Sequence, residues 1–317
     1  NSGVFQGSFD VFGTDCDGDS IGGFACGQFS WSEVGVISLT PRLNDDEAYL
    51  GTKDVVGNQL EHVGRFVPDR FEVAIIDPGE IKPLCETVAP FNAMGNAMQW
   101  RENTEPRLTI TARALDGLVT ENYTVNEGQF QYLSATDIER TFNQTDNSAQ
   151  DEEGNPFPVN VNRSAGELTR SNEPGVMQYS FAADDAITYR KKEPAPSSQA
   201  LPVRVEPFVP DYSIDINTVE DADGVASPQL PLAIRPDFGE AEMRYARLRL
   251  GNNYGPETLP LVMPMTAEFW NGSKFVTNTE ENGCWQYNPQ QDPKLLDSVV
   301  AVNESTDKDF GLSEGEP

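Results

Sequence analysis

The amino-acid sequence predicts an all-β protein made of tandem immunoglobulin-like β-sandwich domains. Three observations support this fold class. Apolar residues recur with a period of two along many short segments, and no segment shows a sustained helical period. Turn residues are frequent, with 26 Gly and 23 Pro in 317 residues. Short strands separated by turns at this spacing are typical of β-sandwiches.

Length and composition predict three units. We expect a partial or small β domain at residues 1–63 and an immunoglobulin-like β-sandwich at residues 64–150. Residues 151–317 hold one or more further β-sandwich domains. The start lacks an initiator Met, which indicates a processed piece, and the polar ending fits a fragment cut within a domain as well as a natural terminus.

In the first unit, residues 4–12, 28–34 and 35–40 alternate at the close spacing of an antiparallel meander. In the second unit, Pro68 predicts a strand that lies at an edge or begins after the proline.

The clearest strand covers residues 107–115, with Leu108, Ile110 and Ala112 on one face, and Asp116-Gly117 forms the turn after it. Residues 134–142 are the longest helix candidate. The acidic residues 144–158 show no periodicity and predict a linker or long loop.

Residues 239–285 predict three consecutive strands. The second and third are joined at Asn271-Gly272, a dipeptide that is a strong hairpin signal because both positions tolerate positive φ. The segment contains no residue that looks poised for chemistry.

The net charge is −29, from 22 basic and 51 acidic side chains. Such a surface disfavours nucleic acid and anionic lipid as partners. It suits a cationic partner such as calcium or a basic protein, and it equally suits solubility in a saline environment. No run of about 18 apolar residues exists, so we expect no membrane-spanning segment.

Four cysteines lie at positions 16, 26, 85 and 284. Cys16 and Cys26 enclose a short Gly/Asp-rich loop and are predicted to form a disulfide. Cys85 and Cys284 pair only if distant parts of the chain meet. Either bridge predicts an oxidising compartment outside the cytoplasm.

The sequence offers little support for catalysis, and we expect no enzyme. His62 is the single histidine, and no nucleophile elbow, phosphate loop or dinucleotide fingerprint is present. A glycosidase needs only two carboxylates, so a carbohydrate-active enzyme stays as a lower alternative.

Two acidic clusters are candidate calcium sites. Asp15, Asp17 and Asp19 alternate around a glycine, which resembles a calcium loop, although no glutamate occupies the twelfth loop position. Asp221 and Asp223 form a second, weaker cluster. Both clusters are equally compatible with solvent-facing turns in so acidic a chain.

A glycan-binding module is the main alternative function, because exposed aromatic rings stack on sugars. The candidates are Trp31, Trp100, Trp270 and Trp285, although tryptophan more often packs in a core.

Two stretches of the chain resemble one family. The first contains the segments GRFVPDRFEV, FNAMGNAMQW and LTITARALDGLVTENYT, and the second is the block MRYARLRLGNNYGPETLPLVMPMTAEFWNGSKFVTNTEENGCW. Both are similar to the MshQ-like proteins. These are large exported bacterial proteins linked to biogenesis of the mannose-sensitive haemagglutinin (MSHA) pilus. The resemblance covers residues 64–140 and 239–285.

The resemblance implies an exported protein of a Gram-negative marine bacterium, located outside the cell or on its surface and associated with a type IV pilus and cell adhesion. It carries over no catalytic residues. We therefore expect a non-enzymatic structural or adhesive component that presents a binding surface on rigid β modules. The expected partners are pilus subunits, other surface proteins, or a host or surface glycan.

Overall fold

The computed structural model describes most of the chain. The described residues are 3–9, 13, 16–42, 55–86, 89–124, 132–150, 154–191, 204–256, 262, 264–280 and 284. Within them the chain forms β-strands and a single 3-10 turn, η1 (Ala135–Asp137). The predicted all-β class is therefore confirmed. No helix in the described part is long and apolar enough to cross a membrane.

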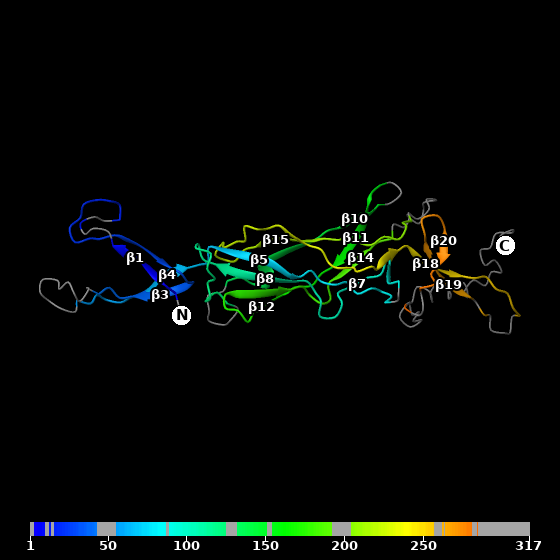
Figure 1. Ribbon diagram of the computed structural model, residues 1–317, viewed down its shortest axis with the longest axis horizontal. Coiled ribbons are helices and arrows are strands. Elements are labelled where there is room, and N and C mark those ends of the chain that lie inside the picture. Colours follow the sequence, from blue (N-terminus) through cyan, green and yellow to red (C-terminus); the bar gives the residue numbers. More distant parts are fainter. Residues whose placement is uncertain are drawn as a thin grey trace, which may run out of the picture.

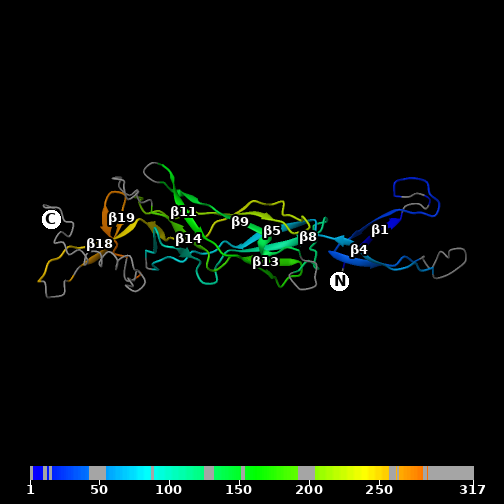
Figure 2. The ribbon, with the colours of Figure 1, turned by 180° about the vertical axis from the view of Figure 1, so that it is seen from behind.

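The molecule is elongated. Figure 1 shows an N-terminal arm at one end, a long body in the middle and a small sheet at the other end. The same order along the axis is seen from behind (Figure 2). The chain thus progresses broadly along the rod, while individual sheets combine segments that are distant in sequence.

The N-terminal arm consists of two antiparallel two-stranded sheets. One pairs β1 (Phe5–Phe9) with β2 (Gly27–Trp31), and the other pairs β3 (Gly35–Leu39) with β4 (Leu60–Phe66). Strand β4 ends before Pro68, and β5 begins after it, as the proline predicts.

The first sheet of the body has the order β12-β13-β8-β5. Its strands are β5 (Arg70–Asp77), β8 (Arg107–Arg113), β12 (Glu167–Arg170) and β13 (Val176–Ser180). Leu108, Ile110 and Ala112 of β8 are fully buried, and the residues between them are half-buried. The alternation predicted for this strand is confirmed.

A second sheet has the order β16-β15-β9. Its strands are β9 (Ile138–Phe142), β15 (Ile214–Val219) and β16 (Leu232–Ile234). Apolar residues of this sheet and of the first sheet belong to one buried cluster, which extends from Val34 at the arm to Tyr245 beyond the body. A single continuous core therefore runs along the rod.

A third sheet has the order β10-β11-β14-β7, and a short parallel pair joins β6 to β17. These strands are β6 (Phe91–Ala93), β7 (Met98–Gln99), β10 (Thr145–Gln150), β11 (Pro156–Asn162), β14 (Ala186–Tyr189) and β17 (Glu242–Arg244). Strands from both sides of residue 150 pair with each other in this sheet and in the first two.

The far end is the sheet β18-β19-β20, with strands β18 (Ala246–Leu250), β19 (Met265–Trp270) and β20 (Phe275–Thr277). The predicted hairpin is present between the last two. The Asn271 side chain accepts hydrogen bonds from the main-chain N–H groups of Ser273 and Lys274, and Gly272 has a φ of +95°. The side chain and the glycine together form the turn.

Two local predictions are wrong. Residues 134–142 form η1 followed by β9, because Ile138, Arg140 and Phe142 face inward with a period of two. Residues 144–158 are not only a loop, since β10 and the start of β11 form a hairpin there. A polar edge strand has no apolar alternation, so its sequence resembles a linker.

Candidate functional site

A groove with a volume of about 1130 Å³ opens between β9 and β11. It arises because these two strands diverge. The segment that contains β9 and β10 pairs with β15 over its first half and with β11 over its second half. The last main-chain bond between the two sides joins the Val159 N–H to the Gln144 carbonyl at 2.8 Å.

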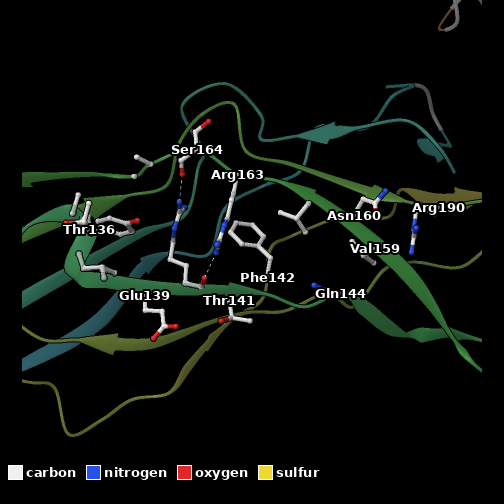
Figure 3. A pocket seen from close by; sticks show the side chains of 17 residues that line it. Thr136, Glu139, Thr141, Phe142, Gln144, Val159, Asn160, Arg163, Ser164 and Arg190 are labelled. Carbon is white, nitrogen blue, oxygen red and sulfur yellow. Dashed lines mark hydrogen bonds between the residues drawn. The ribbon is translucent and has the colours of Figure 1, made fainter.

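Beyond this bond, side chains of two arginines connect the diverging strands. Arg163 Nη1 donates to the main-chain carbonyl of Arg140 at 3.0 Å, and Arg140 Nη2 donates to the carbonyl of Ser164 at 2.5 Å. Figure 3 shows Arg163 crossing the gap from the β11 side toward β9. Guanidinium groups therefore take the place of the missing main-chain ladder.

Arg140 is a buried cation at the inner end of the groove. Its Nη1 lies 2.9 Å from Asp185 Oδ2, and its guanidinium carbon lies 4.5 Å from the centre of the Phe181 ring. Asp185 also accepts from the Ser164 N–H at 2.7 Å. Burial raises the pKa of Asp185, while the Ser164 N–H and Arg140 act against that rise. This ion pair is structural, because its hydrogen bonds hold the two walls together.

Arg163 and Arg190 are the exposed cations of the groove. Arg190 follows β14, and its main-chain N–H donates to the Pro158 carbonyl at 3.0 Å. Neither guanidinium forms an ion pair with a carboxylate among the residues that the structure describes. In a chain of net charge −29, two such cations on one groove make a local positive site.

The remaining lining is mainly polar. Figure 3 places Thr136, Glu139, Thr141, Gln144 and Asn160 along the groove, from the β9 side and from β11. These groups can donate and accept hydrogen bonds. The arrangement suits binding of a polar, negatively charged ligand.

The residues of the first calcium prediction lie in the arm. Asp17 and Asp19 are exposed on a turn, and Asp15 lies outside the described residues. Within the described chain, no group of three or more His, Cys, Asp or Glu side chains is arranged to hold a metal ion. Calcium binding at this loop stays a prediction.

The residues of the second calcium prediction hold the arm to the body. Asp221 accepts from the Tyr123 hydroxyl at 2.6 Å and from the Val225 N–H at 3.0 Å. Asp223 forms an ion pair with Arg65 of β4. Burial is the largest cause that raises the pKa of the Tyr123 hydroxyl, and the hydrogen bond to Asp221 and the charge of Asp221 raise it further. Within the protein, these carboxylates thus stabilise a loop and an inter-region contact.

The predicted Cys16–Cys26 disulfide is present, and Cys85 and Cys284, whose pairing the sequence left open, also form a disulfide. Cys16–Cys26 closes the loop between β1 and β2, and Cys85–Cys284 joins the segment before β6 to the far end of the rod, 199 residues later. Disulfides are typical of proteins exported to an oxidising compartment, which agrees with the expected export of the chain.

The tryptophans pack rather than present open faces. Trp100 is 5% exposed, Trp31 is half-buried, and the half-buried Trp270 lies against Phe275 and the Arg204 guanidinium. Trp285 lies outside the described residues. Their positions offer little support for an aromatic sugar platform.

His62 is exposed on β4 with a φ of 62°. It lies in the arm and does not line the groove. Sequence reasoning missed the groove arginines, because they come from three separate segments. One signal was available, since Arg140 occupies an inward position between two apolar residues of an alternating segment.

Family models identify two regions of the chain. Residues 33–237 match DUF6701, third domain, and residues 244–314 match DUF6701, fourth domain. Strands β1 and β2 precede the matched regions, and the second match begins at the last residue of β17. No curated protein and no solved structure shows significant similarity to the chain. The chain therefore belongs to the DUF6701 family and contains its third and fourth domains.

Proposed function

We propose that this chain is a non-enzymatic extracellular component of a bacterial type IV, MSHA-like pilus system. It presents a binding surface on rigid β modules outside the cell, after export through the periplasm. The resemblance of residues 64–140 and 239–285 to the MshQ-like proteins supports the pilus link. The two disulfides support an extracytoplasmic location.

The continuous buried cluster is the observation that best supports a structural role for the protein. A core that runs from Val34 to Tyr245 resists bending, because interior side chains are close-packed and transmit strain. We further propose that the sheets β12-β13-β8-β5 and β16-β15-β9 form an immunoglobulin-like sandwich, since both contribute to that core.

Deletion of the gene in a piliated bacterium tests this proposal. Surface pili would be counted by electron microscopy, and attachment to an inert surface would be measured, with and without the gene supplied in trans. We expect loss of piliation or attachment that the supplied gene restores. Unchanged piliation and attachment in the deletion strain would refute the pilus role.

A protein- or glycan-binding module is the second candidate, and the groove between β9 and β11 favours it. The polar lining with two exposed arginines suits recognition of a charged partner. A carbohydrate-active enzyme is the lower alternative. Turnover of a polysaccharide by the purified chain, abolished by removing one carboxylate, would replace both proposals.

A further inference from the structure

We propose that the groove between β9 and β11 binds an extended acidic segment of a partner protein, which adds as a strand to the free edge of β9. The inference rests on the proposed function, because it assigns the presented binding surface a position and a ligand chemistry.

The edge of β9 is open to pairing. Among the strands that the structure describes, β9 has a partner on one side only, in the order β16-β15-β9. Its Arg140 carbonyl is directed away from β15, since it accepts from Arg163 across the groove. Residues 159–162 of β11 pair with β14 and diverge from β9 on their other side. An extended segment that displaces Arg163 from the Arg140 carbonyl would have a strand edge on each side, which is the arrangement used in strand addition.

The charge of the groove selects an acidic segment. Most arginines elsewhere in the described chain pair with carboxylates, as Arg101 does with Glu80 and Glu86. Arg42 and Arg204 are exceptions within the described residues. Arg163 and Arg190 lack such a carboxylate within the described residues, although acidic side chains outnumber basic ones more than twofold in the chain. Acidic side chains of a partner would supply the missing counter-charges through charge-assisted hydrogen bonds.

The positions of the two arginines set the spacing of the ligand carboxylates. Arg190 is anchored opposite Pro158, and Arg163 lies five residues further along the same segment. At a rise of about 3.3 Å per residue, their backbones are about 17 Å apart. Side chains of a strand return to one face every second residue, so carboxylates four residues apart fall within reach of both flexible side chains.

The lining favours a peptide over a glycan. The aromatic residues that line the groove, Phe142 and Tyr179, are buried in the core, and their rings are not exposed for stacking. A strand edge, in contrast, offers main-chain donors and acceptors that match a peptide backbone.

The test measures binding of defined peptides to the intact chain by fluorescence anisotropy. The probe is labelled acetyl-TEVTVETV-amide, whose glutamates are four residues apart on one face. Three comparison peptides are its Glu→Gln form, the rearranged acetyl-TVEETVTV-amide, and a form with alternate main-chain nitrogens methylated. Polygalacturonate is the glycan competitor. We expect saturable binding of the probe alone, weakened by salt.

The matched variants are Arg190→Gln, Arg163→Gln and Arg163→Lys, with Arg42→Gln as the charge control in the arm. Arg190→Gln removes a guanidinium with no carboxylate partner in the described structure, so folding should be retained. We expect each groove Arg→Gln change to weaken binding about tenfold, which corresponds to one charge-assisted hydrogen bond. Arg163→Lys should weaken it less, and Arg42→Gln should leave it unchanged.

Absence of saturable binding, equal binding of the methylated peptide, or insensitivity to Arg190→Gln would each overturn the proposal. Arginine-dependent binding of polygalacturonate without binding of the probe would also overturn it in favour of a glycan site. These outcomes leave the pilus role untouched, since piliation is measured in the deletion strain. Conversely, if the peptide binds but the deletion strain has normal piliation and attachment, the pilus role is refuted and the proposed peptide site in the groove is retained.

Discussion

The N-terminal arm and the body are built from strands with the same two-residue period, yet they are stabilised differently. Phe5, Phe9 and Phe29 of the arm are exposed, and the Phe29 ring contacts the other two, with ring centroids 5.2 Å from Phe5 and 5.0 Å from Phe9. Phe71 of β5 is fully buried and packs on Tyr123 in the continuous core.

The difference shows that strand pattern and core formation are separate properties. A two-stranded ribbon has no second layer to cover its apolar face, so it depends on local contacts and on its disulfide. A strand of the body gains its stability from the strands paired with it and from the buried cluster to which its apolar side chains belong. The following substitutions measure this difference.

The largest contrast should come from one phenylalanine in each region. Phe71→Ala removes a fully buried ring and should lower the free energy of unfolding by about 4 kcal/mol. Phe9→Ala removes a ring that is 61% exposed and should lower it by less than about 1 kcal/mol. Urea unfolding followed by circular dichroism measures both. Equal losses would mean that the arm is part of the core.

Breaking the buried ion pair should have the next largest effect. Asp185→Ala leaves the Arg140 guanidinium buried without its carboxylate and should cost about 3 kcal/mol of unfolding free energy. Asp211→Ala is the control, because its ion pair with Arg235 is exposed. A loss below about 1 kcal/mol for Asp185→Ala would mean that the groove walls are held together by other contacts.

Tyr189→Phe tests the buried polar contacts of the body. The Tyr189 hydroxyl donates to Asp146, which is 2% exposed, so its removal should cost about 2 kcal/mol by leaving a carboxylate oxygen without a donor. Burial, followed by the charge of Asp146, raises the pKa of Tyr189 above its usual value of 10.0.

The raised pKa of Tyr189 predicts how the free energy of unfolding depends on pH. The pKa of Tyr189 is higher in the folded than in the unfolded state. The protonated hydroxyl therefore contributes its full stabilisation to the free energy of unfolding below about pH 10, and this stabilisation is lost as the pH rises toward the folded-state pKa. Stability should therefore fall above that pH, with a shallower slope in Tyr189→Phe. Identical slopes in urea titrations of both proteins would contradict the assignment.

The smallest effect on the body is expected from the disulfide of the arm. A double substitution, Cys16→Ser with Cys26→Ser, should increase proteolytic cleavage of the loop between β1 and β2. The free energy of unfolding of the body should change by less than about 0.5 kcal/mol. A larger change would show that the arm and the body unfold together.

The candidate site was harder to predict than the fold. Candidate residues chosen by type, such as Asp17, His62 and Trp100, lie in the arm or in the core and do not line the groove. The groove depends on Arg163 and Arg190, which are ordinary charged residues in sequence. They become a site only because β14 brings Arg190 beside β11.

The sequence by itself determined the all-β class, the alternating strand that begins at residue 107, the Asn271-Gly272 hairpin and the short disulfide loop. All four depend on local spacing, turn chemistry or nearby cysteines, which neighbours in the chain specify. Only the tertiary structure decided which strands are buried, that Cys85 reaches Cys284, and that β9 and β11 diverge around a groove. These features depend on pairing between distant segments, and a two-residue period does not specify which strand lies beside another or what covers its face.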